Sequence, residues 1–264
     1  MRVAILSDIH ANLPALEAVL EHIDALGAVD GLYHLGDLVG YAPWPNEVVA
    51  RLRERAIPGV AGNYDSTVAT DYAHCGCRYE DSRQEALSHA SYEWTRRHVS
   101  AETRSWLGSL PFRIDLRPAG GHVPGATVTL VHGAPTLNTL YWTEDRPDAF
   151  CRKMAARAGL GAGDLLVFGH THVPWERRVD AIRFVNAGSV GRPKDGDPRA
   201  CYLLLELPVG EADAGAGASV ERVRVPYDVE RAARAIREAG LPEELGDFLR
   251  SGRSEARRGT TSSV

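Results

Sequence analysis

A carboxylate and an imidazole stand one residue apart at the end of the first apolar segment of the chain. Residues 3–6 read Val-Ala-Ile-Leu, as expected for a short buried strand, and Asp8 and His10 follow closely. Neither residue type is favoured for packing inside a strand, but both can bind a metal ion. The pair therefore predicts a strand that carries a site at its carboxyl end, with further ligands supplied from elsewhere in the chain.

The composition is typical of a soluble globular protein. The 264 residues are 44% hydrophobic and 25% charged, with a formal net charge of −5. A chain of this length can bury a large core, and its acidic balance disfavours binding to a nucleic acid polymer. Its apolar segments are too short to cross a membrane, and its first residues lack a signal-peptide core. We therefore expect a cytoplasmic protein; these features are compatible with a homo-oligomer.

The first part of the chain alternates between strand and helix patterns. Apolar residues recur at helical spacing over 13–23 and again over 45–55, whereas 31–35 and 57–61 are predicted strands. This β-α-β-α-β order predicts a parallel, doubly wound sheet. Ligands of such sheets gather beyond the carboxyl ends of the strands. Four polar residues stand at such ends: Asp8, His10, Asp37 and Asn63.

The rest of the chain combines a helical segment with short strands. Residues 66–110 are mostly helical in pattern, and they either cap the strand ends beside the site or pack on the sheet. Later strands are predicted at 112–116, 127–131, 165–168, 175–179, 182–185, 201–207 and 220–225, and helices at 147–158 and 228–239. Residues 211–218 are expected to form a surface loop, and the polar residues 251–264 a disordered tail.

Seven side chains suited to metal binding lie at or just after predicted strands. They are Asp8, His10, Asp37, Asn63, His132, His170 and His172. Seven ligands are too many for one tetrahedral site, but they suit two ions that share a carboxylate. Two ions about 3.5–4 Å apart can clamp the attacking and leaving oxygens of a phosphoryl displacement and lower the pKa of a bridging water. The ligand set therefore predicts a dinuclear hydrolase.

Five short motifs resemble those of the calcineurin-like metallophosphoesterase family. In chain order they are Asp8-x-His10, Gly36-Asp37-x-x-Gly40, Gly62-Asn63-x-Asp65, His132-Gly133 and Gly169-His170-Thr171-His172. The resemblance covers about residues 1–230. Further runs, among them 186–191, are similar to the small single-domain bacterial and archaeal branch of the family, which is phosphodiesterase-like.

The resemblance implies an α/β fold, namely a four-layer α/β/β/α sandwich of two mixed β-sheets flanked by helices, in a single domain over residues 1–250. It also implies two divalent metal ions, drawn from Mn, Fe, Zn and Ni. One ion would be held by Asp8, His10, Asp37 and His172, and the other by the bridging Asp37 with Asn63, His132 and His170. The expected reaction is hydrolysis of a small phosphate ester by in-line attack of a metal-bridging hydroxide.

One position departs from the family pattern. The family's most active phosphatases have a histidine directly after the asparagine of the third motif, where it contacts the substrate phosphate, but here the residue is Tyr64. A phenol with a pKa of about 10 is a poor acid at pH 7, although it could donate a hydrogen bond to a phosphoryl oxygen. We therefore favour phosphodiesters over monoesters as substrates. The predicted catalytic residues are Asp37, Asn63, Tyr64 and Asp65, of which Asp65 is equally well explained as a helix cap.

Tyr64 also motivates a second hypothesis, a metal-bearing scaffold or regulatory protein on the same fold with little catalysis. The complete ligand set argues against it. The run 74–77, His-Cys-Gly-Cys, suggests a third metal site, but no second cluster matches it, so free thiols near a turn are the preferred interpretation. Arg192 and Lys194 either contact phosphate or belong to a solvated loop. His34 is interpreted as a core residue or as a support for the ligands.

Overall fold

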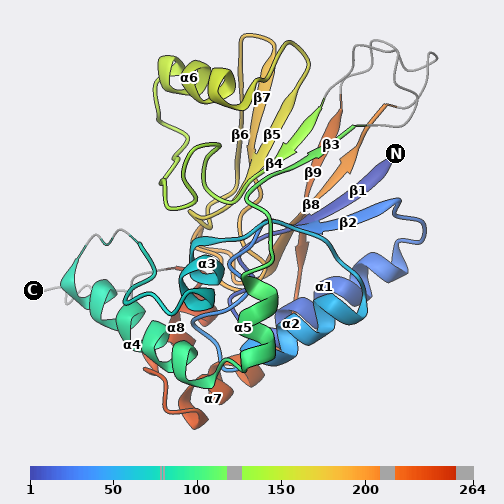
Figure 1. The fold of residues 1–264 in the computed structure, drawn as a ribbon. Coiled ribbons are helices and arrows are strands. Elements are labelled where there is room, and N and C mark those ends of the chain that lie inside the picture. Colours follow the sequence, from blue (N-terminus) through green and yellow to red (C-terminus); the bar gives the residue numbers. More distant parts are fainter. Residues whose placement is uncertain (78, 80, 118–126, 209–217, 254–264) are drawn as a thin grey trace, which may run out of the picture.

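The side chains of strand β1 (Arg2–Leu6) point alternately to two different layers of the fold. In the computed structural model, which describes residues 1–77, 79, 81–117, 127–208 and 218–253, this strand is almost completely buried (Figure 1). Val3 and Ile5 pack into a core shared with the second sheet, whereas Ala4 and Leu6 pack into a core shared with helices. Because successive side chains of a strand point to opposite faces, β1 must be covered on both sides.

The strands form two mixed sheets. In the first, the order is β2 (Gly31–His34), β1, β8 (Ala200–Glu206) and β9 (Ser219–Val225); β1 is parallel to β2 and antiparallel to β8. In the second, it is β3 (Ile114–Leu116), β4 (Val128–Leu130), β5 (Leu165–Phe168), β7 (Ile182–Asn186) and β6 (Trp175–Val179). The predicted doubly wound parallel sheet is therefore corrected, because β8 returns antiparallel beside β1.

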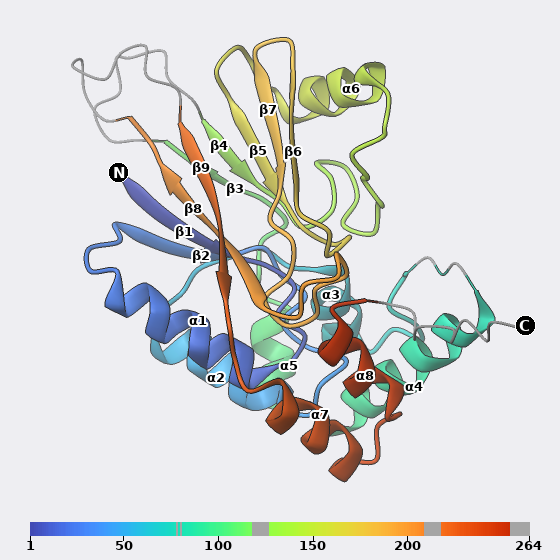
Figure 2. The same ribbon diagram turned by 180° about the vertical axis from the view of Figure 1, so that it is seen from behind.

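Helices cover the outer faces of both sheets (Figures 1 and 2). Helix α1 (Leu13–Ala25) and helix α2 (Pro45–Glu54) pack on the first sheet, and α6 (Asp148–Ala158) packs against β5, β6 and β7 of the second. The apolar core between the sheets joins residues of β1 and β8 to residues of β4, β5 and β7. The predicted four-layer α/β/β/α sandwich is confirmed.

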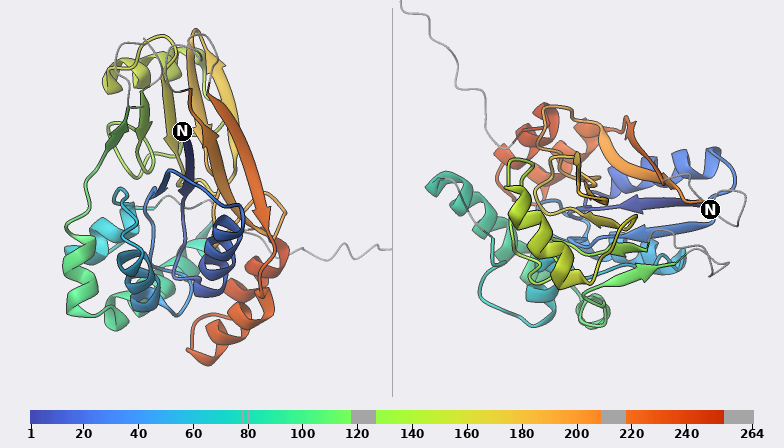
Figure 3. Two further views of the ribbon diagram at one scale, coloured as in Figure 1. Left: turned by 90° about the vertical axis from the view of Figure 1, so that its right-hand side faces the viewer. Right: turned by 90° about the horizontal axis from the view of Figure 1, so that it is seen from above.

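The remaining helices gather at the end of the sandwich away from α6 (Figures 1 and 3). They are α3 (Asn63–Ala69), α4 (Ser82–His98), α5 (Ala101–Leu107), α7 (Val229–Glu238) and α8 (Glu244–Ser251). Helix α8 was not predicted, and its last residue, Ser251, is the first residue of the segment expected to be a disordered tail. Residues 254–264 of that tail and residues 211–217 of the expected surface loop lie outside the described residues. Among the described residues, no helix combines the length and apolarity needed to span a bilayer.

The strand predicted at 57–61 is replaced by a single bridge. Gly59 pairs in parallel with His34 at the end of β2, and the backbone N–H of Ala61 then donates to the carbonyl of Pro111 at 2.8 Å. Pro58 has no backbone N–H, so it cannot contribute a donor to a longer ladder. The segment thus crosses the edge of the first sheet and leads directly into helix α3.

Candidate metal centre

The carboxyl ends of four strands and the start of one helix bring the seven candidate ligands together. Asp8 and His10 follow β1, Asp37 follows β2, His132 follows β4, and His170 and His172 follow β5. Asn63 is the first residue of α3. Because β1 and β2 are parallel, as are β4 and β5, their ends meet at one edge of the sandwich. All seven side chains are buried.

The ligands fall into two groups. The ligand atoms of Asp8, His10 and His172 lie within 4.8 Å of one another, and the same holds for Asp37, His132 and His170. Asn63 joins the second group, because its Oδ1 lies 3.1 Å from Nε2 of His132. The two groups match the two sets of ligands that the family resemblance implies.

Asp37 lies between the two groups. Its Oδ2 is 3.8 Å from Nε2 of His10 in the first group and 3.4 Å from Nε2 of His132 in the second. Its Oδ1 accepts a hydrogen bond from the backbone N–H of Tyr64 at 2.8 Å, which fixes the carboxylate. One oxygen of Asp37 therefore faces both groups, as a carboxylate shared by two ions must.

Backbone carbonyls orient three of the four imidazoles. Nδ1 of His10 is paired with the Val39 carbonyl at 3.0 Å, and Nδ1 of His132 with the Leu35 carbonyl at 2.8 Å. Nδ1 of His172 is paired with the Arg192 carbonyl at 2.7 Å. A carbonyl accepts but cannot donate, so each Nδ1 carries a proton, and in the neutral ring Nε2 presents a lone pair.

The lone pairs of His10 and His172 face one another, an arrangement that a bound cation would stabilise. Nε2 of His10 and Nε2 of His172 are 3.0 Å apart, and Nε2 of His172 is 3.2 Å from Oδ1 of Asp8. Oδ1 of Asp8 is buried and accepts no hydrogen bond from a described residue. Its partner Oδ2 is occupied by Ser7 Oγ at 2.6 Å and by the His170 N–H at 3.0 Å. Three converging acceptors without a proton between them form a donor set suited to a metal ion.

The electrostatics of the site favour neutral imidazoles at His10, His170 and His172 and a charged imidazole at His132. Burial, together with the neighbouring His172, lowers the pKa of His10 to about 3, and burial lowers the pKa of His172 well below its usual value. Burial also lowers the pKa of His170 to about 3. At His132, burial acts in the same direction, but the carboxylates of Asp37 and Asp8 and the Leu35 carbonyl together outweigh it and raise the pKa to about 9. A cation beside Asp37 would compete with that proton, since a metal ligand must be deprotonated.

The backbone at the ligands adopts a conformation that non-glycine residues rarely use. Five of the seven candidates have positive φ angles: Asp8 at 52°, His10 at 49°, Asp37 at 51°, His170 at 67° and His172 at 61°. Each such residue turns the chain sharply at the end of a strand. Such conformations persist only where the surrounding structure holds them, and they cluster at functional sites.

Close backbone approaches hold the ligand loops together. A Cβ on Gly36 would lie 2.1 Å from the backbone nitrogen of Gly62, and a Cβ on Gly169 would lie 2.4 Å from Oδ2 of Asp8. Gly36 also has a φ of +87°. Only glycine fits at these points, so the glycines of the motifs let loops from different strands meet at the ligands.

The loop at 186–191 supports the candidate ligands. Asn186 Nδ2 donates to the Gly169 carbonyl at 2.8 Å and to Thr171 Oγ1 at 3.0 Å. Ser189 Oγ donates to the Asp8 carbonyl at 2.7 Å. The loop therefore links the chain segment of His170 and His172 to that of Asp8.

Asp65 caps helix α3 and links the start of this helix to the loop of Asp37. Its carboxylate accepts from the backbone N–H of Gly62 at the start of α3 and from that of Leu38 beside Asp37, each at 2.9 Å. Burial and the nearby Asp37 carboxylate raise the pKa of Asp65 to about 7. The side chain thus fixes the position of Asp37 relative to Asn63.

The Tyr64 side chain is buried among aromatic rings and faces helix α4. Its hydroxyl is hydrogen-bonded to Ser88 Oγ at 2.9 Å, and its ring centroid lies 5.4 Å from that of His10. Burial raises the pKa of Tyr64 well above its usual value. A hydroxyl engaged in this way is a poor proton donor, so the contacts favour a positioning role through the ring and the backbone N–H.

Cys75 and Cys77 form a disulfide, which corrects the prediction of free thiols. The carbonyl of Cys75 accepts a hydrogen bond from Asn63 Nδ2 at 2.8 Å, which leaves the amide oxygen of Asn63 directed toward His132. Sequence spacing alone missed this pairing. His34, in contrast, is a buried residue beside Trp106, with ring centroids 6.1 Å apart, in line with its interpretation as a core residue.

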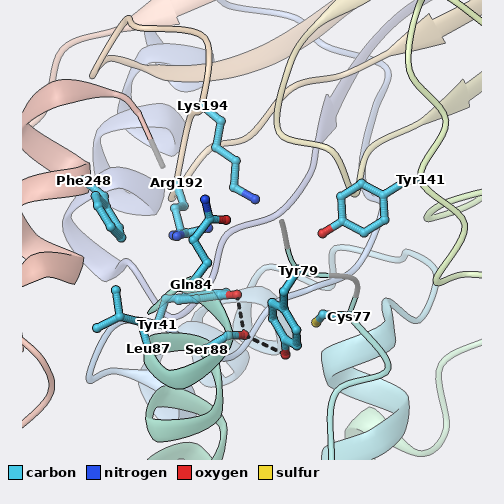
Figure 4. Close-up of a pocket in the computed structure, with 10 residues that line it drawn as sticks. All are labelled: Tyr41, Cys77, Tyr79, Gln84, Leu87, Ser88, Tyr141, Arg192, Lys194 and Phe248. Carbon is cyan, nitrogen blue, oxygen red and sulfur yellow. Dashed lines mark hydrogen bonds between the residues drawn. The ribbon is translucent and has the colours of Figure 1, made fainter. Parts of the chain in front are cut away.

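A pocket that no sequence motif marks adjoins the centre (Figure 4). Its described lining residues are Tyr41, Cys77, Tyr79, Gln84, Leu87, Ser88, Tyr141, Arg192, Lys194 and Phe248. The Tyr41 ring centroid is 4.8 Å from that of His10, and the Tyr141 ring centroid is 4.5 Å from that of His170. Arg192 and Lys194, for which the sequence left two readings open, both line this pocket.

The fold and the site define an α/β protein with a candidate two-metal centre at the strand ends. A sequence model described as a calcineurin-like phosphoesterase superfamily domain matches residues 1–209. The chain therefore belongs to the calcineurin-like phosphoesterase family.

Individual relatives agree with this assignment. An uncharacterized protein of Methanocaldococcus jannaschii is 32% identical over 95% of this chain and 98% of its own length. Phosphodiesterase YfcE of Escherichia coli K12 is 29% identical over 79% of this chain and 89% of its own length. The crystal structure of a metallophosphoesterase from Sphaerobacter thermophilus matches with a TM-score of 0.70 and 32% identity over 96% of this chain and 99% of that chain.

Proposed function

We propose that this protein is a dinuclear metal-dependent phosphoesterase that hydrolyses small phosphodiesters. The observation that carries the proposal is the position of Asp37, whose Oδ2 faces His10 on one side and His132 on the other. Membership of the phosphoesterase family supports hydrolysis of a phosphate ester. We further propose that residues 1–250 act as one domain in the cytoplasm.

The ligand roles follow from the two groups. Asp8, His10, Asp37 and His172 would hold one divalent ion, and Asp37, Asn63, His132 and His170 the other. Imidazole and carboxylate ligands suit Mn, Fe, Zn and Ni alike. When bound, two such ions supply an activated water and stabilise negative charge on the phosphoryl oxygens.

The residues around the ligands would act by positioning. The Tyr64 N–H and the Asp65 carboxylate fix the loop of Asp37, and the Cys75 carbonyl fixes the amide of Asn63. Carbonyl partners keep the imidazoles in one tautomer, so that their lone pairs stay directed into the site. Preorganisation of this kind removes the need to reorient groups during the reaction.

Tyr64 supports a preference for diesters. A phosphate monoester with an alkoxide leaving group benefits from a nearby acid, and the Tyr64 hydroxyl is engaged by Ser88. A diester with a less basic leaving group depends less on such an acid. The name of the relative YfcE, a phosphodiesterase, agrees with this preference.

The test uses bis-p-nitrophenyl phosphate with protein loaded with Mn. We expect Asp37→Asn and His132→Ala to lose about 100-fold or more in kcat/KM, because each removes a ligand of a charge-stabilising centre. Circular dichroism and metal analysis of the same samples check folding and metal content. Asp180→Asn, at an exposed turn, makes the same chemical change outside the site and should retain full activity.

Unchanged turnover in either ligand variant would contradict the mechanism. Wild-type protein that binds two ions but hydrolyses no monoester, diester or nucleotide would favour the scaffold hypothesis instead. Metal content and turnover must therefore be measured on one purified sample.

A further inference from the structure

The pocket beside the candidate metal centre contains a buried arginine with one N–H donor that has no partner among the described residues. Arg192 is only 7% exposed, and its Nε is buried without a hydrogen-bond partner among the described residues. Its guanidinium carbon lies 4.1 Å from the ring centroid of Tyr41 and 5.6 Å from that of Phe248. The two rings fix the plane of the guanidinium. A buried cation with an unpaired donor is costly unless an acceptor joins it.

The pocket is otherwise cationic and rich in hydroxyls. Lys194 lines it together with Arg192, and none of its described lining residues is a carboxylate. The hydroxyls of Tyr41 and Tyr79 both meet Ser88 Oγ, at 3.0 and 3.1 Å (Figure 4). In a chain with a net charge of −5, this is a local environment that attracts an anion.

The pocket's place and size limit what it can bind. Arg192 is tied to the centre through its own carbonyl, which accepts from Nδ1 of His172 at 2.7 Å. None of the seven candidate ligands belongs to the described lining, so a group in the pocket lies beside the reacting phosphorus and not at it. The cavity measures about 30 Å³, which suits a small group.

We propose that this pocket binds a second anionic group of the substrate, a phosphoryl or carboxyl group next to the scissile phosphate, with Arg192 as its main contact. The inference rests on the proposed phosphodiesterase function and narrows its substrate class to diesters that carry a further negative charge. A planar guanidinium held between two rings presents its donors in the fork that such anions match.

Two matched pairs of compounds test the proposal and separate the two anions. The first pair is 5′,5′-linked diadenosine with one or with two phosphates, and the second is glycerophosphoethanolamine and glycerophosphoserine. We expect wild-type protein to prefer the more anionic member of at least one pair by about tenfold in kcat/KM, mainly through KM. Arg192→Met should reduce that preference to about twofold or less, and Arg192→Lys should retain part of it.

A control variant and a binding measurement keep the outcomes distinct. Arg178→Met removes the same charge at an exposed position of the edge strand β6, and it should leave the preference unchanged. Calorimetric titration of the same pairs into metal-loaded wild-type and Arg192→Met protein, each checked by its Tm, measures the preference without turnover.

Three results would overturn the proposal. The first is that wild-type protein shows no preference in either pair, and the second is a preference that survives in Arg192→Met. The third is that Arg192→Met loses kcat/KM equally for both members of a pair. Any of these can occur while bis-p-nitrophenyl phosphate is still hydrolysed, in which case the phosphodiesterase function stands. Conversely, failure of that hydrolysis with a preserved binding preference would refute the catalytic function and leave the anion pocket.

Discussion

Tyr64 is the residue at which the chain departs from its family, and its contacts predict a small effect of removing its hydroxyl. The hydroxyl is bonded to Ser88 and does not face the ligands, so Tyr64→Phe should keep kcat/KM for bis-p-nitrophenyl phosphate within about threefold. Loss of a buried hydrogen bond should cost about 1 kcal/mol and lower the Tm by about 2–4 °C. Steady-state kinetics and a thermal melt measure both effects.

Ser88→Ala serves as the matched control, because it removes the other partner of the same hydrogen bond. It should resemble Tyr64→Phe in activity, with a comparable or larger loss of stability, since Ser88 also meets Tyr41 and Tyr79. A loss of more than about 30-fold in Tyr64→Phe alone would show instead that the hydroxyl takes part in the reaction.

The loop after β7 and the loop after β1 meet at Gly191, and this contact predicts a strong effect of a single methyl group. A Cβ at Gly191 would lie 1.7 Å from the carbonyl oxygen of Ile9, which stands between Asp8 and His10. Gly191→Ala should therefore displace the ligand loop and cost about 2–3 kcal/mol. We expect a Tm lower by about 4–12 °C and weaker metal binding, measured by thermal melts and metal titration.

Gly161→Ala is the control for this prediction. A Cβ there would lie 3.9 Å from Oδ2 of Asp164, an ordinary contact. Its Tm should change by no more than about 2 °C. If Gly191→Ala matched this control in stability and metal affinity, the two loops would not depend on their close approach.

The elements that the sequence predicted well are those whose pattern is local. Strands β5 and β6 have the predicted bounds, because apolar runs with turn residues at both ends define them. The segment at 57–61 failed as a strand because Pro58 removes a ladder donor. Helix α8 was missed because it is short and contains Gly246, which weakens a helical pattern.

In the candidate site, too, the part that lies in short motifs could be predicted and the part formed by tertiary packing could not. The seven candidate ligands could be proposed from the sequence because each belongs to a short motif; six of them follow a strand, and Asn63 begins helix α3. The pocket could not, because Tyr41, Arg192 and Phe248 come from three distant segments that only the fold brings together. Positive φ angles at His10 and His172 also leave no trace in residue type. Local pattern therefore locates the candidate ligands, whereas tertiary packing forms the pocket beside them.

At the scale of the whole molecule, the candidate metal centre lies between the two sheets. Asp8, His10 and Asp37 extend from the first sheet, and His132, His170 and His172 from the second. Nε2 of His10, from the first sheet, and Nε2 of His172, from the second, converge without an intervening proton, 3.0 Å apart. Without cations, this repulsion acts across the interface between the sheets, so the apoprotein should be less stable than the metal-loaded protein.

Metal removal should therefore lower the stability of the whole fold. A ligand that binds only the native state at 100 times its Kd adds about 2.7 kcal/mol, which corresponds to a rise in Tm of roughly 5–11 °C. We expect the Tm of chelator-treated protein to rise by at least this much on addition of Mn, Zn, Fe or Ni, as measured by scanning calorimetry. The metal-induced rise in Tm should be smaller in His132→Ala. It should equal that of wild type in His89→Ala, because His89 is exposed on α4. An unchanged Tm with every metal would contradict a metal centre at this interface, because ions bound between the two sheets cannot leave their stability unaffected.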